Sequence, residues 1–393
     1  MALHNNKFYI WHNNMCITYL ITLKKFEQFF IANGWQKTEE PADSDIIVIG
    51  ACASFLPWFD MYAQKIKSIA PLGKRLVVYG CLPIVNRKFF NRETSDVELV
   101  IPTKYPEHIE QVIEDPKVMW NDLYEPSEFR REDIVDYIPD KRYVIIQYGC
   151  SEKCTFCPHR IGIGPERSRP KKDIINQIRR DVTEGAKIIV LEGSNAGSWG
   201  LDLMPKQTYS ELLGGVLGIA DDFEIYIGNF AAKWINRYGE YLIHPRITDV
   251  KVPIQTSSSR LLKFIGRDSN VRHIGPILKR LKKANPQVVL RTEIIVGLPT
   301  ETRQELQETL EFVSKHFDKV AVFSYDFHPN TKMARMNLPF FDNSEIEEKL
   351  RYAMEFFKKD SNTIVQFCCG DVCFNMSENK SARQSVVDRI MRT

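Results

Sequence analysis

The sequence lacks an excess of charge of either sign, since 53 Lys and Arg residues face 50 Asp and Glu residues among 393. A chain this close to neutral carries no large electrostatic footprint for nucleic acid, although a local basic groove is compatible with it. The sequence also lacks a run that approaches the ~18 apolar residues of a membrane span. Its first residues do not combine a basic segment with an apolar core, as a signal peptide does. We therefore expect a cytoplasmic protein that binds no membrane.

The composition is that of an ordinary globular protein, with 44% hydrophobic and 26% charged residues, which excludes a disordered, collagen-like or coiled-coil chain. The length predicts two or three domains. Cysteine is the most informative residue type. An odd number of cysteines in a reducing compartment disfavours a disulfide framework and favours thiolate ligands for a metal. The nine cysteines are Cys16, Cys52, Cys81, Cys150, Cys154, Cys157, Cys368, Cys369 and Cys373.

The first part of the chain, residues 1–92, alternates short apolar runs with helical patterns, which predicts a small parallel α/β sheet of the flavodoxin-like kind. Buried strands are expected over 8–11, 45–50 and 75–80, with helices over 18–33 and 63–69. Cys16, Cys52 and Cys81 each come after one of these strands. Ligands collect at the carboxyl ends of strands in open parallel sheets. The topology therefore predicts that the three thiols converge.

Residues 93–139, which are rich in proline and acidic residues, are expected to be a connector. Residues 140–335 then hold six larger strand–helix units, which predicts a partial (β/α)6 barrel, since a full eight-unit barrel needs roughly 250 residues. Helices are expected over 172–184, 272–284 and 302–316, the last with a capping box at Thr302 and Glu305. The expected strands are Tyr143–Tyr148, Ala186–Leu191, Phe223–Ile227, Ile247–Ile254, Val288–Val296 and Lys319–Tyr325.

Cys150, Cys154 and Cys157 directly follow the first expected barrel strand with the spacing C-x-x-x-C-x-x-C. Three thiolates in eight residues can ligate three corners of a cubane iron–sulfur cluster and leave one iron open to a small molecule. The alternative is a structural zinc site built from these cysteines and His159, in a non-catalytic zinc-binding scaffold. Zinc fingers usually pair C-x-x-C with a second pair, so the spacing fits zinc less well.

This spacing after the first strand of a βα barrel resembles the radical S-adenosylmethionine (SAM) superfamily, and the chain as a whole resembles its methylthiotransferase branch. That branch carries three further cysteines in an N-terminal α/β domain, which Cys16, Cys52 and Cys81 match in order and approximate spacing. Other matches to family motifs are S-R-P at 168–170, P-x-Q-S-G-S at 253–258, I-V-G-F-P-G-E-T at 295–302 and Y-S-x-R-x-G-T-x-A at 324–334.

The resemblance implies two [4Fe–4S] clusters, two SAM molecules and a one-electron reductant such as flavodoxin or ferredoxin. The cluster of Cys150, Cys154 and Cys157 would bind and cleave SAM to a 5′-deoxyadenosyl radical. The auxiliary cluster of Cys16, Cys52 and Cys81 would hold the sulfur that replaces a C–H hydrogen as SCH3. A radical SAM enzyme whose auxiliary cluster donates no sulfur is the alternative. The residues expected to contact SAM are Phe156, Glu192, Gly193, Gln255, Ser257, Arg267, Glu293, Gly297 and Leu298.

The sequence departs from the family pattern in three ways that matter. Tyr19 stands where the family usually has Asn, and Ser257 and Thr300 replace family glycines. Residues 336–393 predict one helix, over 344–359, and a tail too short for the family's C-terminal TRAM domain. We therefore expect a peptide or protein substrate, such as a ribosomally synthesised natural-product precursor, ahead of a tRNA adenosine. Cys368, Cys369 and Cys373 are compatible with metal binding, substrate contact or three reduced thiols in the tail, of which we expect the last.

Overall fold

The computed structural model describes residues 6–13, 16–94, 96–131, 138–267, 271–360, 363–369 and 372–375. The chain forms two compact units. The first unit contains Met1–Tyr143, Tyr148–Cys150 and Pro158–Glu166, and the second unit contains the rest. Each unit is built around its own sheet, and each is considered by itself below.

The first unit contains a five-stranded parallel sheet in the order β2-β1-β3-β4-β5. This is the flavodoxin-like strand order, so the predicted fold class is confirmed. All six residues of β3 are buried, as expected for a central strand covered on both faces. The strands are β1 (Lys7–His12), β2 (Gln36–Lys37), β3 (Ile46–Ala51), β4 (Arg75–Gly80) and β5 (Leu99–Pro102).

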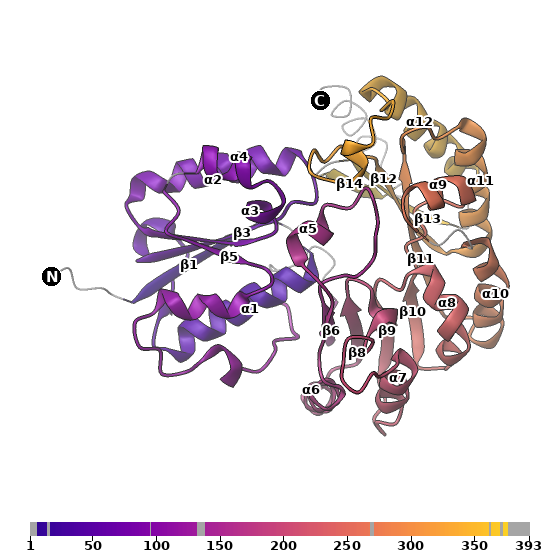
Figure 1. Cartoon of the computed structure of the whole chain (residues 1–393). Helices are drawn as coiled ribbons and strands as arrows, with labels where there is room; N and C mark the ends of the chain where they lie inside the picture. Colours follow the sequence, from indigo (N-terminus) through magenta and orange to yellow (C-terminus); the bar gives the residue numbers. More distant parts are fainter. Residues whose placement is uncertain are drawn as a thin grey trace. The chain divides into compact units, whose positions relative to one another are not determined.

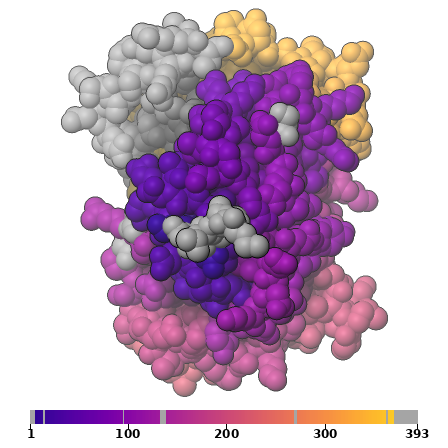
Figure 2. All heavy atoms as spheres, turned by 90° about the vertical axis from the view of Figure 1, so that its left-hand side faces the viewer, coloured from indigo at the N-terminus to yellow at the C-terminus, as the bar shows by residue number. Residues whose placement is uncertain are grey.

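Helices cover both faces of this sheet, with α1 on one face and α2 and α4 on the other (Figure 1). The helices are α1 (Ile17–Ala32), α2 (Pro57–Ile69), α3 (Leu82–Val85) and α4 (Arg87–Glu93). The sheet extends beyond residue 92, because β5 lies in the expected connector and pairs with β4. The 3-10 segments Pro106–Val112 and Trp120–Asp122 fold back on the unit, where the rings of Phe26 and Trp120 pack 5.5 Å apart. Figure 2 shows the corresponding surface, with the indigo start of the chain beside purple atoms of later residues.

The second unit contains a nine-stranded sheet in the order β14-β13-β12-β11-β10-β9-β8-β6-β7. The six predicted barrel strands are present as consecutive neighbours, from β6 to β12, and the pairs from β8 to β12 are parallel. The strands are β6 (Lys141–Tyr148), β7 (Arg167–Ser168), β8 (Ile188–Gly193), β9 (Glu224–Ile227), β10 (Ile247–Lys251), β11 (Val289–Val296), β12 (Lys319–Ser324), β13 (Ile364–Cys369) and β14 (Val372–Asn375).

The helices of the barrel follow the expected pattern, and the capping box of Thr302 and Glu305 is present at the start of α11. A large core of apolar residues lies between the sheet and these helices. No helix among the described residues is both long and apolar enough to cross a bilayer. The helix α5 (His159–Ile163) belongs to the first unit, and the helices of the second unit are α6 (Lys171–Thr183), α7 (Tyr209–Leu217), α8 (Ala232–Tyr238), α9 (Ser259–Phe264), α10 (Gly275–Ala284), α11 (Arg303–His316) and α12 (Asn343–Lys359).

The C-terminal segment differs from the expected helix and tail. The helix is confirmed as α12, but β13 then pairs parallel with β12, and β14 pairs antiparallel with β13. The run Ile-Val-Gln-Phe from residue 364 alternates in burial and has the β-branched and aromatic residues that strands prefer. Cys368 is buried and disulfide-bonded, so the expectation of three reduced thiols in a tail is wrong for this residue. The residue opposite it in the β13–β14 register is Cys373.

Candidate active site

The loop that carries the C-x-x-x-C-x-x-C spacing begins at Gly149, immediately after β6. Gly149 has φ +72°, and a Cβ atom there would lie 1.9 Å from the Pro165 carbonyl oxygen, so only glycine fits. The Cys150 amide donates to the Gly164 carbonyl at 3.1 Å, and the Thr155 amide donates to the Ile265 carbonyl at 2.9 Å. Cys154 is buried, whereas Cys150 and Cys157 are half-buried. The loop is thus fixed by backbone hydrogen bonds while two of its thiols keep access to solvent.

Polar groups stand at the carboxyl ends of β6 and β8, next to one another. Glu192 accepts hydrogen bonds from Asn229 Nδ2 at 2.8 Å and from the Gly193 amide at 3.2 Å. Burial raises the pKa of the Glu192 carboxyl, against the lowering effect of Lys251. Gln147 on β6 is fully buried, and a Cβ atom on Gly193 would lie 3.2 Å from its Oε1 atom. That oxygen has no hydrogen-bond partner among the described residues.

Gln147 is a residue that the sequence reasoning missed. The signal was available, because Gln147 interrupts the apolar strand Tyr-Val-Ile-Ile just before the cysteine loop. A buried acceptor without a partner costs free energy unless a ligand supplies a donor. The ammonium group of an amino acid is such a donor, so this end of the barrel fits the amino-acid part of SAM.

Glu293 on β11 forms an ion pair with Lys251 on β10, with the two atoms 2.5 Å apart. A carboxylate inside an apolar strand is costly without a partner, and Lys251 supplies one. Gln255 follows β10 with its backbone at φ +69°, an uncommon conformation for a residue other than glycine. Ser257 is buried, and its amide donates to Thr309 Oγ1 at 3.0 Å. Ser257 is thus held against α11.

Arg267 lines a small cavity of about 10 Å³ at the same end of the barrel, together with Glu152, Lys233 and apolar residues that include Ile254. Glu152 is fixed on two sides, since it pairs with Lys233 and accepts from Asn195 Nδ2 at 2.8 Å. Phe156 is half-buried and packs against the barrel core. A cavity of this size has room for about one water molecule, and two of its charged residues, Glu152 and Lys233, pair with each other beside Arg267.

The turn after β11 contains Gly297, with φ +84°, and the buried Leu298. The Gly297 amide donates to Glu301 Oε2 at 2.9 Å. Burial raises the pKa of the Glu301 carboxyl from its ordinary 4.5 to about 7, although this hydrogen bond and Lys349 lower it. Glu301 therefore fixes the turn through its hydrogen bond with the Gly297 amide. It was not among the residues expected at the site.

The other three expected ligands lie at the carboxyl edge of the sheet in the first unit. Cys16 caps α1 after β1, Cys52 follows β3, and Cys81 follows β4. Cys52 and Cys81 are fully buried, and burial raises the pKa of the Cys52 thiol. Burial raises the pKa of the Tyr62 hydroxyl, and electrostatic interactions with Cys52, Cys81 and Cys16 raise it further. The three cysteines thus follow strands at the same edge of the sheet, and their convergence on one cluster stays a prediction.

Several neighbours shape this edge. Tyr19 Oη lies 2.7 Å from Cys81 Sγ. Ser54 Oγ lies 2.9 Å from Cys52 Sγ and 2.6 Å from His159 Nε2. His159 is the first residue of α5 and comes two residues after Cys157. Its ring nitrogen contacts the hydroxyl of Ser54. Among the described residues, no group of three or more His, Cys, Asp or Glu side chains is arranged so that it could hold a metal ion. The donor chemistry of the edge, three thiols with hydroxyl neighbours, is nevertheless that of an iron–sulfur cluster with an open iron.

The barrel, the cysteine loop and the polar carboxyl ends together define a radical SAM enzyme. The Radical SAM superfamily matches residues 144–313. The solved structure of the radical SAM methyltransferase TsrM from Kitasatospora setae superposes with a TM-score of 0.59 at 11% identity, covering 84% of this chain and 74% of that one. At this identity the likeness concerns the fold.

Curated relatives identify the branch within this class. The chain is 30% identical over 302 residues to the ribosomal protein uS12 methylthiotransferase RimO of Thermotoga petrophila, covering 74% of this chain and 69% of that protein. It is 28% identical over 355 residues to the tRNA-2-methylthio-N(6)-dimethylallyladenosine synthase of Herpetosiphon aurantiacus, covering 86% and 78%. The chain therefore belongs to the radical SAM methylthiotransferase family, enzymes that use SAM and two [4Fe–4S] clusters to transfer a methylthio group.

Proposed function

We propose that this enzyme replaces a C–H bond of a peptide or protein residue by C–SCH3, with Cys150, Cys154 and Cys157 holding the SAM cluster. Cys16, Cys52 and Cys81 hold the auxiliary cluster. The observation that carries the proposal is that the two triplets follow strands of different sheets at their carboxyl ends, three strands of the first sheet for one triplet and β6 of the second sheet for the other. The clusters, when bound, supply the electron and the sulfur.

The barrel residues bind and orient SAM. Gln147 Oε1 and the Glu192 carboxylate accept from the ammonium group, and Arg267 faces the carboxylate. The turn at Gly297 and Leu298 lets the backbone approach adenine closely, and Glu301 fixes that turn. Gln255, Ser257, Glu293, Gly193 and Phe156 complete the proposed pocket as ribose, substrate or packing contacts. Excluding water from this pocket protects the radical from quenching.

Two observations support a peptide or protein as the substrate. The near balance of 53 cationic and 50 anionic residues gives weak general attraction to a polyanion. The relative that is 30% identical carries the name of an enzyme acting on a ribosomal protein.

A tRNA adenosine is the second candidate. Relatives at 27–28% identity are named for methylthiolation of tRNA, and one of them spans 86% of this chain. We further propose that the enzyme works in the cytoplasm with a flavodoxin or ferredoxin as electron donor.

The test offers the cluster-loaded enzyme, SAM and a low-potential reductant to two substrates in parallel, a precursor peptide encoded by a neighbouring gene and bulk tRNA. We expect the mass gain of SCH3 replacing H in the peptide. The control is the Cys16→Ala/Cys52→Ala/Cys81→Ala variant, which should give no methylthiolated product. A 2-methylthioadenosine in tRNA, with the peptide unchanged, would overturn the peptide proposal and establish the second candidate.

A further inference from the structure

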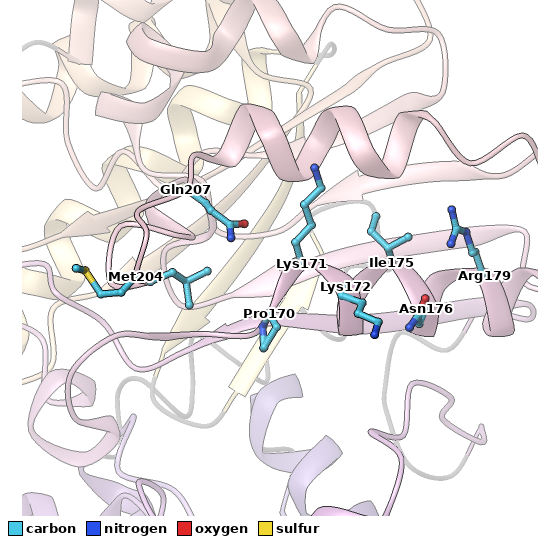
Figure 3. A pocket seen from close by; sticks show the side chains of 9 residues that line it. Pro170, Lys171, Lys172, Ile175, Asn176, Arg179, Met204 and Gln207 are labelled. Carbon is cyan, nitrogen blue, oxygen red and sulfur yellow. The ribbon is translucent and has the colours of Figure 1, made fainter.

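The second unit contains a cavity of about 630 Å³ that has no part in the site described above. It lies between α6 and the connection from β8 to α7, and Figure 3 shows its lining side chains. The start of α6 and this connection both follow strands at their carboxyl ends, the same end of the barrel as the cysteine loop, and the lining extends from there along α6 to Arg179. The lining residues are Pro170, Lys171, Lys172, Ile175, Asn176, Arg179, Leu203, Met204 and Gln207.

The wall of the cavity is held in place by Ser168, the first residue of the S-R-P motif. Its amide and hydroxyl both donate to the Asp202 carboxylate, at 2.8 and 2.6 Å, and its hydroxyl accepts from the Gly200 amide at 2.8 Å. Trp199 Nε1 donates to the Arg169 carbonyl at 3.0 Å. The connection is therefore fixed to the start of α6. A cavity that is formed before its ligand arrives loses less entropy on binding.

The cavity is lined by the cations Lys171, Lys172 and Arg179 and by no acidic residue, although Glu211 in the first turn of α7 interacts electrostatically with Lys171. Lys171, Ile175 and Arg179 are spaced by four residues and project from one side of α6 (Figure 3). Neither Lys171 nor Arg179 forms an ion pair within the described part of the chain, whereas the adjacent Arg180 pairs with Asp181 and Glu184. The carboxylate of Asp202 is occupied by Ser168, so it does not neutralise these cations.

The same cavity exposes apolar surface. Met204 is 88% exposed, the highest value among the large hydrophobic residues that the structure describes, and Leu203 and Ile175 lie beside it in the lining. A phosphodiester backbone has anionic groups but nothing apolar to cover such side chains. An acidic peptide segment that also carries an apolar side chain complements both parts of the lining.

We propose that this cavity binds an acidic segment of the peptide substrate, with carboxylates at Lys171 and Arg179 and an apolar side chain against Met204. The inference rests on the proposed function and names the recognition element of its substrate. Because the cavity lies outside the SAM pocket, the segment that binds here is separate from the residue that is modified. The cavity thus selects the substrate by its sequence around the acceptor residue.

The test measures binding by fluorescence anisotropy on the cluster-loaded enzyme under argon, without reductant. The probes are labelled short peptides with the repeats Leu-Glu-Glu, Leu-Gln-Gln and Ser-Glu-Glu, and an oligouridine RNA of equal length. We expect the Leu-Glu-Glu peptide to bind most tightly. The Lys171→Gln/Arg179→Gln variant should weaken it about fivefold, since two exposed charge contacts are removed. Met204→Gln should weaken it about threefold, with little effect on Ser-Glu-Glu.

The matched control is Lys279→Gln/Lys283→Gln, which removes two exposed cations spaced by four residues on α10 and should leave binding within about twofold. Equal circular dichroism and iron content would show that all variants fold and load alike. Unchanged peptide binding in Lys171→Gln/Arg179→Gln would overturn the inference, as would tighter binding of oligouridine that depends on the same two cations. Because binding is measured without turnover, a tRNA product in the activity assay would refute the proposed substrate separately.

Discussion

The carboxyl edges of the two sheets are built from different chemistry. In the first unit Cys16 is exposed at this edge, whereas the thiols of Cys52 and Cys81 are buried near the hydroxyls of Tyr19, Tyr62 and Ser54. In the second unit the corresponding edge is rich in paired charges, such as Lys251 with Glu293 and Lys233 with Glu152. A cluster ligated by thiolates needs few other charges around it, whereas a zwitterionic ligand needs both signs. Under the proposed function, the comparison teaches that the same strand geometry would hold a cluster alone in the first unit and a cluster together with an amino-acid derivative in the second.

The largest expected effect comes from removing either cysteine triplet. The reconstituted enzyme should hold about eight irons in two cubane clusters, and either triple-Ala variant should hold about four. Loss of Cys150, Cys154 and Cys157 should abolish 5′-deoxyadenosine formation, because this triplet alone activates SAM. Loss of Cys16, Cys52 and Cys81 should abolish only the methylthiolated product. Iron analysis and chromatography of the nucleoside measure both, and full iron content in either variant would refute the assignment.

A side chain at Gly162 should disrupt one edge and spare the other. A Cβ atom there would lie 2.8 Å from Cys81 Sγ, and Thr103 Oγ1 holds the Gly162 carbonyl at 2.6 Å, so the backbone has little room to retreat. Gly162→Val should therefore lose most of the auxiliary cluster while 5′-deoxyadenosine formation persists. Gly214→Ala on α7 is the control, because nothing lies within 4 Å of the added atom. Full auxiliary cluster content in Gly162→Val would show that the edge rearranges freely.

In the second unit, we expect the free energy of unfolding to depend on pH through the Glu301 carboxyl. The pKa of this carboxyl is raised to about 7 in the folded protein, so the group favours folding least when it is ionised. Between pH 4.5 and pH 7 this carboxyl is ionised in the unfolded chain but largely protonated in the folded protein. The free energy of unfolding therefore falls by about 3 kcal/mol as the pH rises through this range. Glu301→Gln keeps an acceptor for the Gly297 amide and removes that loss. Urea unfolding of both proteins at pH 5 and pH 7.5 should show the variant gaining relative stability at the higher pH.

The smallest expected effect concerns Thr300, the residue that replaces a family glycine. Thr300 has φ +67°, which is unfavourable for a β-branched side chain, and Arg260 holds its hydroxyl and carbonyl at 3.0 and 2.8 Å. Thr300→Gly should relieve the strain and stabilise the protein by about 0.5–1 kcal/mol, since the added freedom of the unfolded chain offsets part of the gain. Thermal unfolding measures it. A loss of stability would mean that the contact with Arg260 outweighs the strain.

Much of the fold could be predicted because both sheets are marked by apolar runs of strand length. The run from Ile46 to Ile49 and the six barrel strands fall where the sequence places them. The fifth strand of the first sheet was missed, since Leu99–Pro102 is short and lies in a proline-rich stretch. The strand β13 was not predicted either, although its residues alternate in burial and include the β-branched and aromatic types that strands prefer.

The cysteines of the candidate site could be predicted from the sequence, whereas its polar residues could be predicted less well. Spacing and strand position suffice for Cys150, Cys154 and Cys157. The importance of Gln147 and Glu301 depends on burial, which a single sequence does not give. Ser257 lies close to its expected place, yet its amide and hydroxyl point to Thr309, a packing contact between distant segments that local pattern cannot predict.

The disulfide at Cys368 has a consequence for the working enzyme. It lies on β13, which pairs with β12 at the end of the barrel sheet. Structural disulfides have reduction potentials near or below about −300 mV, and low-potential iron–sulfur clusters are charged at about −400 mV and below. A reductant strong enough to prime the SAM cluster therefore has the driving force to open this bond as well. Opening it would remove a covalent bond at the end of the barrel sheet, so the enzyme under a strong reductant would differ in covalent structure from the enzyme without one.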